Sequence, residues 1–343
     1  MPGIRFPQLA EHFMSALEMA GATVLVLSGR ASRPLVLGVV YGDSTYRLEV
    51  YLWTITQGGK GRGRPREYRI QRTAADPFVL KAGVRTIMGG WHEDTGTFAF
   101  WDVRRHLTEA KSPSSQISLD TLEKASAIGM TTEVRNLAEG QEIAIAVQPD
   151  YLLWYIQEYE RIYDVAPEAD DAGSLVDAKP EDEREFIDSG EDESSISRRH
   201  KLVDVVRNFR DARFRPLVLR AYSYRCCLTG VALRLVDAAH IVPVSEPSST
   251  DEPNNGIALN PLLHRAYDNG LLGLLPDGRT ALNQRLINDL ESKRLHAGLD
   301  LVRGLIPPQM TMPTSAEFAP PDAYLRKGLL VRGWTEDEIA AAG

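Results

Sequence analysis

Three side chains capable of acid–base or metal chemistry lie close together in the second half of the chain. His240 ends an apolar, β-type run at residues 235–243, and a short predicted helix carries His264 and Asp268. Helix positions four apart share a face, so His264 and Asp268 can bind one divalent ion together. A histidine held rigidly at a strand end is suited to act as a general base. The spacing therefore predicts a metal-dependent phosphodiesterase site.

The elements that must position these side chains have clear local signals. Asn260 followed by Pro261 is an N-cap with proline at the first helical position, and Asn269 with Gly270 supplies the stop. Each candidate alone has an ordinary alternative, because a strand-end histidine is usually structural and a His/Asp pair four apart is often only a surface contact. Their combination in register favours the site.

The residues His240, Asn255 and His264 resemble the three letters of the HNH, or ββα-metal, endonuclease motif of bacterial restriction-type enzymes. The gaps of 15 and nine residues are similar to those of colicin-type members, and the resemblance covers about residues 200–285. It implies a one-metal mechanism with His240 as general base and Asn255 tying down the loop that orients it. His264 and Asp268 would hold the divalent ion, with Mg²⁺ the first choice and Mn²⁺, Ni²⁺ or Zn²⁺ as alternatives. Cleavage would leave 5′-phosphate and 3′-hydroxyl ends.

Two features depart from the family pattern. Many HNH enzymes place a metal-binding Asp or His directly before the base, where this chain has Ala239. Asp237 lies on the same strand face as Ala239 and is the predicted substitute as third metal ligand. The structural zinc cysteines are also missing, because Cys226 and Cys227 are adjacent and form no paired CxxC. Asn260 occupies one of their places, so we expect this fold to rest on packing.

Length predicts two domains, and the mixture of helical and alternating strand patterns in the first half of the chain, beginning with a helix and strands at residues 5–30, predicts an α+β fold. The chain has 343 residues, 43% hydrophobic and 25% charged, as in a soluble globular protein. Residues 164–194 hold 13 acidic and two basic side chains, so the rest of the chain carries +3 of the total −8. We therefore predict a mixed α/β recognition domain at 1–163, an acidic flexible linker at 164–197, and an HNH nuclease domain with a C-terminal helical extension at 198–343. The linker is either a tether or a DNA mimic that masks basic surfaces.

Basic side chains near both domains predict contacts with double-stranded DNA. A loop with four glycines and a proline at residues 58–66 presents basic residues suited to phosphate contacts, although a solvated hairpin tip is the alternative. The predicted DNA-binding residues are Lys60, Arg62, Arg64, Arg66, Arg213 and Arg265. Trp91 and Trp101 flank Gly96 and could form an aromatic cage for a base or pack in the core, and core packing is the favoured alternative.

These features together predict a DNA endonuclease that restricts foreign or modified DNA, as in antiviral defence. A homodimer could cut both strands. The N-terminal segments at 67–71 and 100–106 look similar to the sensor half of bacterial restriction-like proteins. The start of the chain has no continuous apolar signal core, so we expect a cytoplasmic protein without a membrane segment. The alternatives are a nuclease for RNA or branched DNA, and a non-catalytic DNA-binding regulator with a decayed site, for which Ala239 is the argument.

Overall fold

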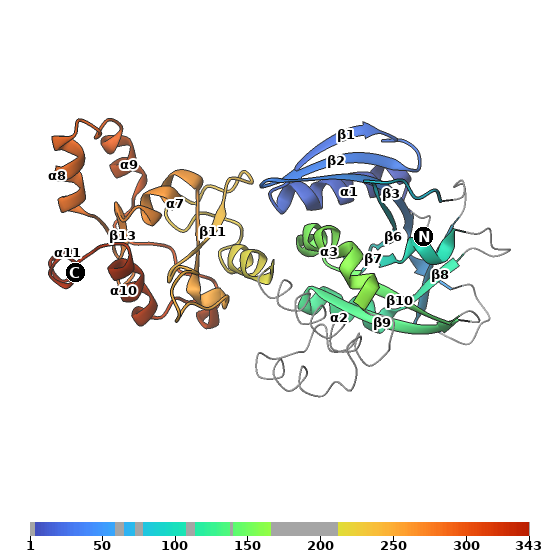
Figure 1. Cartoon of the computed structure of the whole chain (residues 1–343). Helices are drawn as coiled ribbons and strands as arrows, with labels where there is room; N and C mark the ends of the chain where they lie inside the picture. The colour runs from blue at the N-terminus through green and yellow to red at the C-terminus, as the bar shows by residue number, and fades with distance from the viewer. Residues whose placement is uncertain are drawn as a thin grey trace, which may run out of the picture. The chain divides into compact units, whose positions relative to one another are not determined.

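The computed structural model describes residues 4–58, 65–72, 78–107, 114–137, 140–165 and 212–342. The chain divides into two compact units, residues 1–209 and 210–343, and both mix helices with strands (Figure 1). The predicted α+β class with two domains is therefore confirmed. Lys60, Arg62, Arg64 and residues 166–197 of the predicted linker lie outside the described residues.

The N-terminal unit begins with a helix and a run of strands, as the local patterns predict. Its elements in chain order are α1 (Phe6–Met19), β1 (Thr23–Ser28), β2 (Leu35–Tyr41), β3 (Ser44–Thr54), β4 (Thr56–Gln57), β5 (Glu67–Gln71), β6 (Arg85–His92), β7 (Thr97–Trp101), η1 (Val103–His106), β8 (Ser114–Ser118), α2 (Leu119–Ile128), β9 (Met130–Leu137), β10 (Gly140–Val147), η2 (Pro149–Tyr151) and α3 (Leu152–Val165). Ser118 caps α2 by accepting a hydrogen bond from the Thr121 amide at 3.1 Å.

Two sheets enclose the core of this unit. The large sheet has the strand order β1-β2-β3-β6-β7-β10-β9, in which β3 and β6 run parallel and the other neighbours antiparallel. The small sheet has the order β4-β5-β8. Helices α1 and α3 lie together, and α2 lies beside β9 and β10 (Figure 1). Helices α1, α2 and α3 therefore pack against the large sheet, whereas β1 at its edge stays mostly exposed.

Strand β7 shows how the alternation of side chains divides the core. Phe98 and Phe100 face α1, since both rings lie edge-on to Phe13, whereas Ala99 and Trp101 pack in the cluster on the opposite face. Trp91 stacks on His12 of α1 at 4.9 Å and also contacts Phe98. The two tryptophans thus pack in the core on opposite faces of the sheet, and they form no cage.

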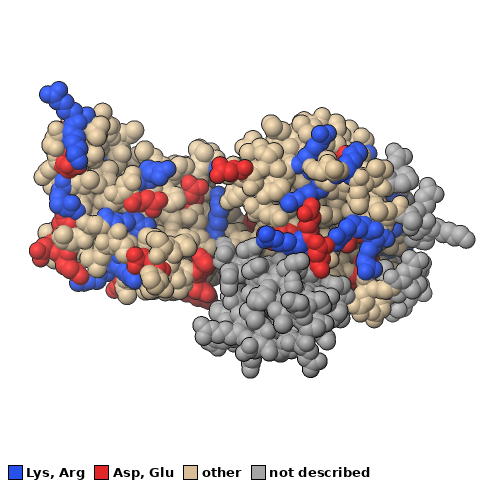
Figure 2. All heavy atoms as spheres, viewed as in Figure 1, with Lys and Arg blue, Asp and Glu red and all other residues tan. Residues whose placement is uncertain are grey.

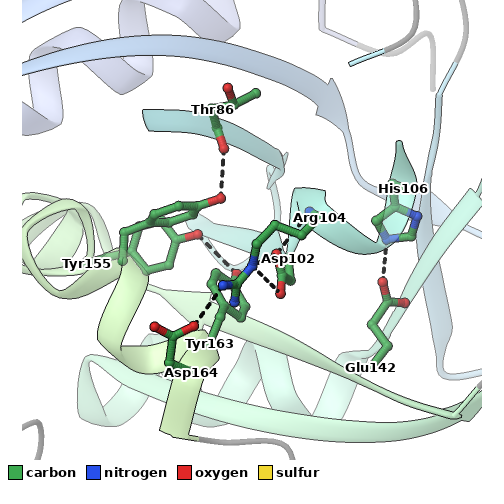
Figure 3. Close-up of polar contacts among 9 residues, drawn as sticks. Thr86, Asp102, Arg104, His106, Glu142, Tyr155, Tyr163 and Asp164 are labelled. Carbon is green, nitrogen blue, oxygen red and sulfur yellow. Dashed lines mark hydrogen bonds and ion pairs between the residues drawn. The ribbon is translucent and has the colours of Figure 1, made fainter. Parts of the chain in front are cut away.

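A polar network joins the end of α3 to η1 (Figure 3). The guanidinium of Arg104 donates to Asp102 at 2.9 Å and to Asp164 at 2.7 Å. Beside it, the buried hydroxyls of Tyr155 and Tyr163 lie 3.1 Å apart, and burial raises the pKa of both phenols well above the ordinary value. These contacts fix the last turn of α3 against the domain.

His92 makes the stability of the N-terminal unit pH-dependent. Burial lowers the pKa of this imidazole below 6.5, against the opposing effect of Asp94, Glu123 and Glu93. Below the unfolded-state pKa, the unfolded chain binds a proton that the folded state does not, so stability falls as the pH drops through 6.5 toward the folded-state pKa. We expect the melting temperature, followed by tryptophan fluorescence, to fall between about pH 7.5 and 5.5. The fall should be smaller in His92→Gln, and an equal fall in both proteins would contradict the prediction.

The C-terminal unit is built from a small hairpin surrounded by helices. Residues 212–221 are helical, and the elements that follow are β11 (Asp237–His240), η3 (Pro253–Asn255), β12 (Gly256–Leu259), α7 (Pro261–Asp268), β13 (Leu272–Leu274), β14 (Thr280–Leu282), α8 (Gln284–Ser292), α9 (Leu299–Leu305), η4 (Ala316–Phe318), α10 (Asp322–Val331) and α11 (Glu336–Ala342). Its hydrophobic core contains residues of the helix at 212–221, both hairpin strands, α7, β13 and α10. Among the helices that the structure describes, none combines the length and the apolar character needed to cross a membrane.

Candidate active site

The candidate site is assembled on β11, β12 and α7. The two strands pair antiparallel, with Asp237 opposite Leu259 and His240 opposite Gly256. Asn260 follows β12 directly and caps α7 by accepting from the Leu263 amide at 3.0 Å, as predicted. Because the helix begins next to the residue opposite Asp237, this register brings Asp237 close to the first turns of α7. The arrangement is a ββα unit.

Asn255 holds the loop between the two strands. Its side chain is fully buried; Oδ1 accepts from the Val242 amide at 2.9 Å, and Nδ2 donates to the carbonyl oxygens of Thr250 at 2.8 Å and Val242 at 3.2 Å. Nδ2 also lies 3.3 Å from Ser249 Oγ. The side-chain amide of Asn255 thus connects the start of the loop, just after His240, to the end of the loop.

We expect Asn255→Ala to lower the unfolding free energy of this unit by about 2–4 kcal/mol, because it leaves several buried backbone groups without partners. Hydrogen-exchange mass spectrometry of peptides within residues 226–274, across a urea series, would measure the loss. Asn254→Ala is the matched control, since Asn254 Oδ1 is buried without a hydrogen-bond partner. An equal loss in both variants would show that Asn255 has no special part in the loop.

His240 is held by two residues that the sequence interpretation missed. Its Nε2 lies 2.9 Å from Asp251 Oδ1, and its ring stacks on Phe214 with centroids 3.7 Å apart. A hydrogen bond from Nε2 to the carboxylate leaves the lone pair on Nδ1, the nitrogen that could then accept a proton. Asp251 is one of several acidic residues in a loop without periodicity, so no sequence signal selects it.

The close stacking depends on a glycine. A Cβ on Gly256, opposite His240 in the hairpin, would lie 2.2 Å from Val218 and 2.9 Å from Phe214. The first helix therefore packs directly on the backbone of β12, and this contact brings the Phe214 ring over His240. Arg213 in the same helix is partly buried, and Arg265 is exposed on α7.

His264 lies between two carboxylates. Its Nδ1 is 3.6 Å from Asp237 Oδ2, and its Nε2 is 3.3 Å from Asp268 Oδ2. The imidazole of His264 lowers the pKa of Asp237, despite an opposing effect of burial. Ala239 is 1% exposed and belongs to the core of the unit.

The geometry distinguishes Asp237 from His264 and Asp268, the two residues that could bind one metal ion together. Two ligand atoms next to each other around a metal ion at about 2.1 Å lie about 3 Å apart, which fits His264 Nε2 and Asp268 Oδ2. Asp237 instead lies against the other ring nitrogen. Within the described residues, no group of three or more His, Cys, Asp or Glu side chains is placed to hold a metal ion together. Asp237 as a third metal ligand therefore stays a prediction.

Asn260 provides part of what the missing zinc cysteines would supply. Its Nδ2 lies 3.4 Å from Thr229 Oγ1 and 3.7 Å from Cys226 Sγ, so the helix cap is connected to the loop before β11. Both cysteines are buried and free. The expectation that packing replaces zinc remains consistent with these contacts.

Comparisons with known protein families agree with this geometry. Residues 226–274 match the HNH endonuclease family. The C-terminal unit contains an HNH endonuclease domain. The match to the HNH domain spans β11, η3, β12 and α7, and β11, η3 and α7 carry His240, Asn255 and His264. In the N-terminal unit, residues 46–156 match a family described as Methylase-associated X1.

Comparisons with curated proteins and solved structures give less information about this chain. No curated protein matched the chain. Among solved structures, a modification-dependent TagI restriction endonuclease aligns with 82% of this chain and 80% of its own, at 13% sequence identity and a TM-score of 0.28. The HNH domain supports a nuclease, and the substrate and the site residues belong to the proposal below.

The residues predicted to contact DNA differ in their surroundings. Arg66 donates to Asp120 at 2.8 Å and also pairs with Glu123, while its side chain stays 49% exposed. Figure 2 shows Lys and Arg side chains interspersed with Asp and Glu on the visible face of each unit, without a surface of one sign. The roles of Arg66, Arg213 and Arg265 in DNA binding stay predictions.

Proposed function

We propose that the protein is a metal-dependent DNA endonuclease that restricts foreign or modified DNA. The observation that carries this proposal is the pairing, on one ββα unit of an HNH domain, of an oriented histidine with a His/Asp pair. Double-stranded DNA is the proposed partner, with two copies of the chain cutting opposite strands, and the proposed location is the cytoplasm.

His240 is the proposed general base. Asp251 accepts a hydrogen bond from Nε2 and Phe214 covers the ring, so the imidazole is held in one tautomer and one orientation. Nδ1 would then take a proton from a water molecule in line with the scissile phosphate. Asn255 contributes indirectly, because it fixes the backbone of Val242 two residues after the base.

His264 Nε2 and Asp268 Oδ2 are the proposed ligands for a divalent ion, most suitably Mg²⁺. A bound ion would neutralise negative charge that grows on the phosphate and the leaving oxygen. Asp237 is proposed to accept a hydrogen bond from the other nitrogen of His264, as carboxylates commonly do behind metal-bound histidines. The direct-ligand role that the sequence predicts for Asp237 is the second role proposed for it.

The N-terminal unit is proposed to choose the DNA. Its match to a family described as methylase-associated supports a role in sensing the modification state of the substrate. Lys60, Arg62, Arg64 and Arg66 would supply phosphate contacts from this unit, and Arg213 and Arg265 from the nuclease unit.

The proposal is tested by incubating the purified protein with plasmid DNA from methylating and non-methylating hosts, with Mg²⁺ or Mn²⁺ and with EDTA. We expect metal-dependent nicking or linearisation that differs between the DNA preparations. Absence of cleavage on every preparation would overturn the proposal, and salt-dependent binding without cleavage would favour a regulatory DNA-binding protein. Parallel reactions with RNA and branched DNA distinguish the other nuclease substrates.

A further inference from the structure

Arg332 directly follows α10 and is buried against the HNH domain. In the sequence it lies about 60 residues after Asp268 and about 90 residues after His240. Its side chain is only 5% exposed. Nη2 donates to the His240 carbonyl oxygen at 2.8 Å, and Nη1 donates to the Ile241 carbonyl oxygen at 2.6 Å. The guanidinium therefore binds the backbone of the proposed base and of the residue after it.

The same guanidinium also reaches α7. Nη2 lies 3.3 Å from Asp268 Oδ1, and the guanidinium carbon lies 3.9 Å from the centre of the Tyr267 ring. Oδ1 of Asp268 thus faces Arg332, while Oδ2 faces His264 Nε2. One carboxylate oxygen is fixed by the arginine, and the other is left toward the proposed ion.

Among residues 212–342, no hydrogen bond or ion pair joins His240 directly to Asp237, His264 or Asp268. The side chain that contacts both groups is Arg332. It joins the strand of the proposed base to the helix of the proposed ligands. A change in its position would move the two groups relative to each other.

Two glycines bring the arginine to this place. A Cβ on Gly328 would lie 2.7 Å from the Ile241 carbonyl oxygen, and one on Gly270 would lie 2.3 Å from the Arg332 carbonyl oxygen. The turn after α10 is also fixed by Trp334, whose Nε1 donates to the Gly270 carbonyl oxygen at 2.9 Å. Backbone therefore packs on backbone on both sides of Arg332.

We propose that Arg332 is a positioning residue for the nuclease reaction, holding the His240 strand and the Asp268 carboxylate in register. This inference rests on the proposed function for the roles of His240 and Asp268. A planar guanidinium suits the task because it serves several acceptors in fixed directions, which the ammonium group of lysine cannot do. A positive charge at position 332 is therefore not sufficient for this role.

The test compares Arg332→Lys with Arg326→Lys in the full-length protein. Arg326 lies on the same helix and pairs with Glu336 at the surface, with 55% of its side chain exposed, so it controls for the Arg-to-Lys change. We expect Arg332→Lys to lower kcat for plasmid cleavage about 10–100-fold and to raise the Mn²⁺ concentration for half-maximal rate by a similar factor. KM for DNA should change less than about twofold, because DNA contacts are not altered. Arg326→Lys should match the wild type.

A double-mutant cycle with Asp268→Asn tests the route of the effect. If Arg332 acts through Asp268, the double variant should lose clearly less than the product of the two single losses. A folded Arg332→Lys protein with unchanged kcat and unchanged Mn²⁺ midpoint would overturn the inference, while an active wild type would leave the proposed function intact.

Hydrogen exchange distinguishes a failure of this inference from a failure of the proposed function. Amides of residues 237–242 should exchange faster in Arg332→Lys than in the wild type, whether or not the protein cleaves DNA; unchanged exchange overturns the inference even if the wild type is inactive. Should Arg332→Lys not fold, wild-type protein labelled with ¹⁵N-arginine provides the measurement. The guanidinium N–H protons of Arg332 should then exchange with solvent more slowly than those of the exposed Arg326, because they are held by the His240 and Ile241 carbonyl oxygens, and equal exchange overturns the inference.

Discussion

Replacing His240 with alanine should lower the rate of DNA cleavage by about 10²–10⁴-fold, the usual contribution of a general base. Alanine cannot take a proton, and no other imidazole is in the hairpin to replace it. The loss should be in kcat, with DNA binding in EDTA unchanged, because the side chain acts on water and the phosphate rather than on the groove. Single-turnover cleavage of plasmid, with binding measured in parallel, provides both numbers.

His296→Ala is the matched control for this variant, since His296 is exposed in the same unit. It should cleave at the wild-type rate. Asp251→Asn should fall between the two, because it keeps the shape of the partner of Nε2 but removes its charge. Cleavage by His240→Ala at the rate of His296→Ala would exclude His240 as the base.

Replacing His264 with alanine should produce a loss of similar size by another route. A bound ion contributes several kcal/mol of charge stabilisation in the transition state, which corresponds to roughly a thousandfold in rate. Losing one of two proposed protein ligands should also abolish the stabilisation that the ion provides. At about 100 times the dissociation constant, that stabilisation is about 2.7 kcal/mol. The wild type should therefore melt at a higher temperature with Mn²⁺, and His264→Ala should not.

Asp237→Asn distinguishes the two roles considered for Asp237. If Asp237 only orients His264, its replacement should weaken the apparent metal affinity about 10–100-fold and leave activity recoverable at higher Mn²⁺ concentration. Asp300→Asn is the control, because Asp300 is 97% exposed on α9. A loss that excess Mn²⁺ does not restore would instead make Asp237 a direct ligand.

The local elements of the site could be predicted because their signals are local. The Asn260–Pro261 pair predicts where α7 begins, and the structure has that cap. Ser118 predicts the start of α2 for the same reason. The motif spacing located the HNH domain that the family comparison also finds. In each case, neighbouring residues satisfy the backbone groups of a helix end or fill one side of a strand.

Other features depended on packing between distant parts of the chain. Trp91 and Trp101 look alike in sequence, but the alternation of β6 and β7 places them on opposite faces of the sheet. Asp251 approaches His240 because Asn255 ties the loop in one conformation. No periodicity or composition of the loop indicates which of its acidic residues approaches His240.

The sequence by itself determined the position of the HNH domain, through the residue types His240, Asn255 and His264 at the spacing of one small unit. The tertiary structure decided which nitrogen each carboxylate faces and which distant residue joins the strand to the helix. Asp237 reaches His264 through strand register, and Arg332 reaches both groups through the close packing of α10. Such contacts depend on how separate elements pack together, which local sequence patterns do not specify.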